Sequence, residues 1–264
     1  MESLYDQTLR NMGSTLHTLA ARVPAPKLVS LNGSPVFRYV EKSIYQALVQ
    51  KLARVITGLH AAHLLLDRGF VQEQAALQRM LDEFHEDISF LAYAVIYNDH
   101  TPLHQKYLDA FFEEEFDAPS PVQSTQKRPM VSREKIRAFV ARSKMAGGDP
   151  STGAELARTI NKTYSGYVHG ASPQIMDLYG GNPPRFHVHG MRGTERQEEH
   201  RHDLWNYFFR SIIAFALVAK AFGDEKLFQS IREYHLEFDK SAGRNAAFHG
   251  ASETNHSINT DAAR

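Results

Sequence analysis

The strongest constraint on the fold is a pair of long segments with helical periodicity, separated only by a short break. From about residue 40 to 67, apolar residues recur with the 3.6-residue spacing of one helix face. A second segment of this kind runs from about 71 to 97. Between them, Arg68-Gly69 is a typical helix stop. The sequence therefore predicts two long antiparallel helices as the body of an all-α helical bundle.

A third long helix is predicted late in the chain. Thr194 to Gln197 match a capping box, and the chain is apolar almost all round from Leu204 to about Phe222. A helix of this kind belongs inside a bundle, so we expect it to be buried. Shorter helices are expected over the other periodic segments, which are 3–21, 103–115, 132–144, 152–168 and a last one ending near Lys240.

The remaining segments are rich in Pro, Gly and polar residues. Residues 23–39 are expected to be a loop or arm, residues 117–131 a linker, and about 170–193 an irregular insert. Strands are expected only around 186–189, where Phe186 to His189 alternate. Residues 1–240 are predicted to form a single helical domain, and residues 241–264 a polar, flexible tail.

Composition excludes several classes of protein. The 264 residues carry 30 Lys+Arg and 30 Asp+Glu, which argues against a bulk polybasic nucleic-acid binder but leaves a local basic groove open. The absence of Cys excludes disulfides, Cys-ligated zinc and thiol nucleophiles. Arg210 interrupts the most apolar run, Leu204–Ala219, which is shorter than the ~20 residues that span a bilayer. We expect a soluble, cytoplasmic protein without a membrane partner.

The densest group of chemically capable side chains lies between Arg158 and Met191. Gly and Pro interrupt the second half of this stretch, as is typical of the irregular surfaces on which sites are built. Its candidate residues are Asn161, Lys162, Tyr164, Ser165, Tyr167, His169, Asp177, His187 and His189.

His169 is the first candidate for catalysis. It closes a predicted helix, four residues after Ser165, and a histidine there could act as general base or acid near neutral pH. Tyr164 lies on a neighbouring part of the same face, and Asn161 and Lys162 precede it as candidate ligand-binding residues. The alternative is a histidine that only caps carbonyls at the end of a helix.

Arg79, Glu83 and Asp87 form a second candidate group, because their i, i+4, i+8 spacing puts them on one face of the 71–97 helix. On an exposed face they would be an ordinary ion-paired surface. If the helix is central they become a buried polar row, and Arg210 would then be a partner, since an unpaired buried guanidinium is too costly to keep.

His187 and His189 share one side of an extended segment, as the first two ligands of some metal hydrolases do. Asp177, Glu199, His200 and His202 could complete such a site. The spacing is common, however, and we expect solvated loop histidines rather than a metal. The sequence has no Gly-rich phosphate loop, G-x-S-x-G or H-E-x-x-H motif, and no cofactor is expected.

Two phrases carry a resemblance to a known family. They are LQRMLDEFHEDISFL (77–91), with an Arg-x-x-x-Glu helix, and TYSGYVHGASPQ (163–174), with a Tyr-Ser-x-x-Val-His-Gly helix end. Together they resemble uncharacterised bacterial helical proteins that look distantly related to the HEPN superfamily. The resemblance covers about residues 40–240. It implies a helical bundle that forms a homodimer and acts as a metal-independent ribonuclease of a toxin–antitoxin or defence system, or else only binds.

The chain departs from the catalytic HEPN pattern, in which four to six residues separate an Arg from a His. Arg158 precedes His169 by more than that, whereas Arg79 and His85 fit the pattern on one helix. Other pairs fit equally well, so the spacing alone decides nothing. They are Arg10/His17, Arg54/His60, Arg196/His202 and Arg244/His249.

Three functions follow as hypotheses. A ribonuclease would use His169 or His85 as base and Arg79 or Lys162 to stabilise the phosphorane. A non-catalytic module would bind a protein or small-ligand partner through the insert and the row of Arg79, Glu83 and Asp87. A metal-dependent hydrolase would use His187 and His189. The proposed active centre requires His169 to lie against that row.

Overall fold

The computed structural model describes residues 3–114, 118, 122–125, 130–143 and 164–241. Over these residues the chain is a helical bundle with two small strand pairs, which confirms the predicted all-α class. Some predicted features lie outside the described residues. They are the capping box at 152–155, most of the 152–168 helix, most of the 117–131 linker, and the tail after residue 241.

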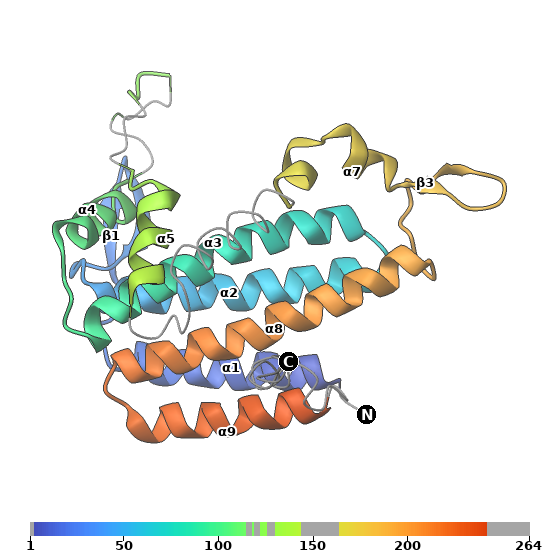
Figure 1. The fold of residues 1–264 in the computed structure, drawn as a ribbon. Helices are drawn as coiled ribbons and strands as arrows, with labels where there is room; N and C mark the ends of the chain where they lie inside the picture. The colour runs from blue at the N-terminus through green and yellow to red at the C-terminus, as the bar shows by residue number, and fades with distance from the viewer. Residues whose placement is uncertain (1–2, 115–117, 119–121, 126–129, 144–163, 242–264) are drawn as a thin grey trace, which may run out of the picture.

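Five long helices make the body of the bundle (Figure 1). The antiparallel pair α2 (Ile44–Asp67) and α3 (Val71–Ile96) pack against each other, as predicted. α8 (Glu195–Ala221) packs on α3 and also contacts α2. α1 (Leu4–Ala20) lies on α2 and α8, and α9 (Glu225–Ser241) covers α8 from outside.

α8 is the buried late helix that the sequence predicts. Leu204, Phe208, Val218 and Ala219 are completely buried, and they belong to one hydrophobic core with the inward side chains of the other long helices. The three larger side chains, Leu204, Phe208 and Val218, each stabilise the fold by roughly 1.5–3 kcal/mol, because burial removes their apolar surface from water. The position of α8 thus follows from the apolar side chains that cover most of the helix after Asp203.

Local capping fixes where the helices begin. The Thr194 hydroxyl accepts a hydrogen bond from the Gln197 amide at 3.3 Å, as a capping box requires. The Gln197 side chain, however, accepts from the Gly193 amide at 2.8 Å instead of completing the box. Ser132 caps α5 (Arg133–Arg142), and α4 (Pro102–Phe111) starts directly after Thr101. Both short helices pack at the end of the α2–α3 pair that is opposite the turn between these two helices.

The expectation that strands occur only around 186–189 is wrong. Residues 23–39 contain a β-hairpin in place of the predicted loop, with β1 (Lys27–Leu31) antiparallel to β2 (Ser34–Arg38). Asn32 and Gly33 connect the strands with φ of 50° and 81°, which is the Asn-Gly turn that suits a two-residue hairpin. The hairpin is mostly exposed, so its strands lack the apolar alternation by which strands are recognised.

The insert projects beyond one end of the bundle (Figure 1). It contains the short helix α7 (Ser172–Met176) and the strand pair β3 (Tyr179–Gly180) and β4 (Arg185–Phe186). The extended segment expected over residues 186–189 is therefore a strand only at Phe186. Among the described helices, none has the length and apolar character needed to cross a membrane.

Two glycines join the insert to the bundle. Gly69, in the turn between α2 and α3, accepts a hydrogen bond from the Met191 amide at 2.7 Å. Both Gly69 and Gly190 have positive φ, of 80° and 96°. A Cβ on Gly69 would collide with the backbone nitrogen of Arg192, and a Cβ on Gly190 would lie 2.5 Å from the Arg68 carbonyl oxygen. The two backbones can approach this closely only because neither residue carries a side chain.

We predict that Gly69→Ala lowers the free energy of unfolding by at least about 2 kcal/mol, because left-handed strain and backbone overlap act together. Gly223→Ala is the matched control, since Gly223 has φ of 69° but no atom within 4 Å of its added Cβ. That control should cost about 1 kcal/mol from strain alone. Urea denaturation measures both. Equal losses would mean that the insert is not held against Gly69.

Candidate functional site

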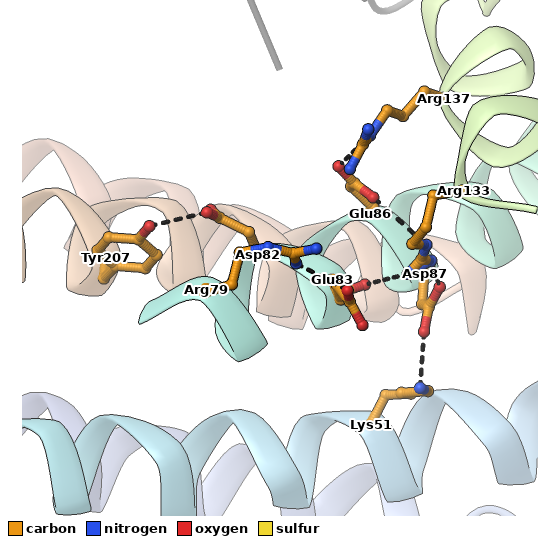
Figure 2. A network of polar contacts seen from close by, with 9 residues as sticks. All are labelled: Lys51, Arg79, Asp82, Glu83, Glu86, Asp87, Arg133, Arg137 and Tyr207. Atoms are coloured by element: carbon orange, nitrogen blue, oxygen red, sulfur yellow. Dashed lines mark hydrogen bonds and ion pairs between the residues drawn. The ribbon is translucent and has the colours of Figure 1, made fainter. Parts of the chain in front are cut away.

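Five charged residues, Arg79, Asp82, Glu83, Glu86 and Asp87, form what we call the α3 polar row (Figure 2). These residues recur at helical spacing along one broad side of α3, and α2, α5 and α8 contribute their partners. The predicted row thus becomes two clusters on one helix, one around Asp87 and one around Asp82.

Asp87 is the centre of the first cluster. Its side chain is nearly buried and accepts from Lys51 of α2 at 2.6 Å and from the Arg133 guanidinium of α5. The Glu86 carboxylate accepts from the Arg137 guanidinium at 2.7 Å and lies 3.6 Å from the Arg133 guanidinium. Burial raises the pKa of Glu86, while the two guanidiniums oppose that shift. Asp87 therefore belongs to a structural ion-pair cluster that attaches α5 to α3.

Asp82 is the centre of the second cluster. It accepts from the Tyr207 hydroxyl at 2.9 Å and from the Arg210 guanidinium at 2.7 Å, both of α8. The sequence predicts a carboxylate partner for Arg210 on α3, but the partner is Asp82 and not Glu83 or Asp87. Burial and then the Asp82 charge raise the pKa of Tyr207, so its hydroxyl stays a proton donor to that carboxylate.

Arg79 and Glu83 are joined to each other across one helical turn. Their ion pair is 2.7 Å long, and Arg79 is mostly buried while the Glu83 side chain is 40% exposed. The Glu83 backbone carbonyl also accepts from Arg133 at 3.3 Å. Each described charge of the α3 polar row thus has a partner within the protein, and none of the row's carboxylates stands free as a base.

His85 faces the interior and not a cleft. Its Nε2 atom lies 2.8 Å from the Ser211 hydroxyl of α8, and the residue is buried. Burial, and secondarily the nearby Arg210 charge, hold its pKa well below the ordinary value. His85 is therefore a neutral histidine of the α3–α8 interface, without access to a substrate in this conformation.

Residues 164–169 are helical and end at Gly170, whose φ is 62°. The Tyr164 hydroxyl donates to Asp203 of α8 at 2.9 Å, and its ring meets the Tyr207 ring edge-on. Burial and Asp203 raise the pKa of Tyr164. Tyr164 therefore lies next to the Asp82 cluster.

His169 is exposed, and no hydrogen bond or ion pair in the described part of the chain joins it to Arg79 or Glu83. Ser165 is half-buried, with no side-chain contact to His169 among the described residues. Asn161 and Lys162 lie outside the described residues. Of the predicted constellation, the structure thus brings Tyr164 near the α3 polar row through Tyr207, and leaves His169 at the surface.

The insert is fixed at several points besides the two glycines. The Asp177 carboxylate accepts from Arg196 at 2.8 Å and from the Tyr167 hydroxyl at 3.3 Å. Burial, with Asp177, raises the pKa of Tyr167 to about 12. The Gln197 side chain donates to the Leu66 carbonyl at 2.6 Å. The base of the insert is therefore attached directly to α8, and through Gln197, which also accepts from Gly193, to the end of α2.

The histidines of the insert do not assemble a metal site. His187 and His189 are half-buried and exposed, and the structure, over the residues it describes, holds no group of three His, Asp or Glu side chains suited to a metal ion. His200, one of the residues that could have completed such a site, bonds instead to Gln74 at 2.8 Å.

Sequence reasoning missed several residues of these clusters, which are Lys51, Asp82, Arg133, Arg137 and Tyr207. A signal existed for two of them, because Arg133 and Arg137 are one helical turn apart on a short helix with an apolar stripe. Comparison with known proteins adds no further residue, since no protein-family model, curated protein or solved structure matches the chain.

We predict that His85→Gln changes the pH dependence of stability. Because the folded-state pKa of His85 is lowered, only the unfolded chain takes up this proton as pH falls below about 6.5. The wild type should therefore lose up to about 1.4 kcal/mol per pH unit from this group, a loss absent in the variant. Other buried histidines titrate in both proteins and cancel in the difference.

Urea denaturation of both proteins between pH 7.5 and about 5.0 checks this prediction. The acid limit lies about one and a half pH units below the ordinary pKa of histidine. The free-energy difference between wild type and His85→Gln should shift in favour of the variant at low pH. Parallel pH profiles would show that His85 is protonated in the folded protein, contrary to its burial.

Proposed function

We propose that this chain is a non-catalytic helical binding module, and that the insert docks an acidic, partly apolar segment of a protein partner. One observation carries the proposal. Large exposed hydrophobic side chains gather on and beside the insert, at Val168, Ile175, Met176, Tyr179, Phe186 and Val188. Exposed apolar groups concentrated in this way mark interaction surfaces on soluble proteins.

The charge of the insert indicates the chemistry of its partner. Its one carboxylate, Asp177, is neutralised by Arg196. Arg185 and Arg192 are exposed and make no ion pair with any described residue. An acidic segment would complement these two cations, and electrostatic complementarity favours the correct partner and speeds association.

A protein partner suits the surface better than single-stranded RNA does. Most of the exposed apolar side chains are aliphatic, whereas single strands are held by aromatic faces on which bases stack. The two exposed rings, Tyr179 and Phe186, meet at 66° with centroids 4.9 Å apart, so their faces are not parallel. The fixed base of the insert supports binding further, because a preorganised surface loses little entropy on association.

We predict that random peptides selected on the purified full chain become enriched in acidic and apolar residues. Fluorescence anisotropy of a selected peptide should give a dissociation constant about tenfold weaker for Arg185→Glu and for Phe186→Ser. Phe37→Ser is the matched control, since Phe37 is an exposed ring on β2, outside the insert. Enrichment of basic peptides, or equal affinity in Phe186→Ser, would contradict the proposal, as would tighter binding of oligouridine at the same residues.

The ribonuclease hypothesis stays a prediction with its own test. Its candidate bases are His169, which is exposed, and His85, which is bonded to Ser211 in the interior. Purified protein incubated with RNA in EDTA should cleave it if this hypothesis holds, and cleavage should fall in His169→Ala or His85→Ala. No cleavage, or cleavage that both variants retain, ends it. The homodimer and the cytoplasmic location are likewise proposals, and mass photometry tests the first.

A further inference from the structure

A separate groove lies at the opposite end of the bundle from the insert. α2, α3, α4 and α5 surround a concavity of about 690 Å³. This volume falls within the roughly 300–1,000 Å³ that small-ligand sites occupy. α4 and α5 are far from the insert in Figure 1, so this groove is independent of the proposed docking surface.

The groove has apolar walls around a charged base. Phe111 of α4 and Ile136 of α5 line it, and exposed Met130 and the adjacent Val131 also line it. Its polar lining consists of two cations, two carboxylates and two hydroxyl groups, which are Lys51, Arg133, Glu83, Asp87, Tyr107 and Ser132. A mostly apolar concavity with a few convergent polar groups is the usual form of a small-molecule site.

The charged base is held in place before any ligand arrives. The Lys51 ammonium lies 2.6 Å from Asp87 and within 5.0, 5.1 and 5.9 Å of the ring centroids of Phe84, Phe111 and Tyr107. Figure 2 shows Lys51 and Arg133 reaching Asp87 from different helices. Such preorganisation lowers the entropic cost of binding.

The charged side chains that line the groove are balanced, with Lys51 and Arg133 against Glu83 and Asp87. Both oxygens of Asp87 and one of Glu83 are already engaged by cations. A guanidinium has more N–H donors than the three contacts of Arg133 use. Arg133 therefore still has donors to offer an anionic group.

We propose that this groove binds a small amphipathic anion, with a carboxylate or phosphate head at Arg133 and an apolar body against Phe111 and Ile136. Ser132 and Arg133 begin α5 at the rim, so the positive end of the helix dipole adds to the charge that the head meets. The ligand leaves the ion pairs in place and uses the donors that remain.

Isothermal titration of the full chain with octanoate, octan-1-ol and octyltrimethylammonium tests this ligand class. Octanoate should bind about tenfold more tightly than the neutral alcohol, as one charge-assisted hydrogen bond implies, and the cation should not bind. Arg133→Gln should remove the preference for octanoate and leave binding of the alcohol unchanged. Arg142→Gln, the same change on the exposed side of α5, should leave both affinities within about twofold.

A second variant keeps the test decisive if Arg133→Gln fails to fold. Ala110→Trp fills the groove without removing a charge, and it should abolish binding of octanoate and of the alcohol. Equal affinity for octanoate and octan-1-ol, or binding that survives Ala110→Trp, would overturn the proposal. Cosedimentation with phosphatidylglycerol vesicles without binding of free octanoate would also overturn it, because the groove would then recognise a membrane surface.

Discussion

Two carboxylates inside the bundle, Asp82 and Asp87, must each be paired with cations or hydrogen-bond donors. The arrangement of the helices depends on this constraint. An ionised carboxylate away from water is costly unless cations and hydrogen bonds compensate it. The compensation here comes from three other helices, because Lys51 lies on α2, Arg133 on α5, and Tyr207 and Arg210 on α8. Each pair therefore also fixes the register of a helix against α3.

This pairing also occupies the charged groups of α3 that a catalytic site would need. A general base needs a carboxylate or imidazole that can reach a substrate, and a phosphorane needs a cation that is still free. The carboxylates of the α3 polar row are bonded within the protein, and His85 is neutral and interior. Hydrogen-bond donors without a described partner remain at the two ends of the bundle, in Arg185 and Arg192 of the insert and in the remaining N–H groups of Arg133 in the groove.

How far the sequence predicts the fold depends on whether the signal is local. Helical periodicity and caps such as Thr194 identify the long helices, since both act within a few residues. The hairpin was missed because exposed strands carry no apolar alternation, although Asn32-Gly33 was a valid turn signal. The sequence predicts that Arg210 pairs with a carboxylate of the 71–97 helix, but not that this carboxylate is Asp82. Adjacent positions such as Asp82 and Glu83 point about 100° apart on a helix, and only packing decides which of them meets α8.

The exposed apolar surface of the insert has a structural explanation in its attachment. A segment with this many large hydrophobic side chains would ordinarily fold onto the core, since each Å² left in water costs about 25 cal/mol. The contact between Gly69 and Gly190, together with the bonds to Asp177 and Gln197, holds it away from the bundle. Burial of this exposed apolar area by another molecule would be favourable. The attached base and the uncovered apolar face are therefore the two features on which the proposal of a docking surface depends.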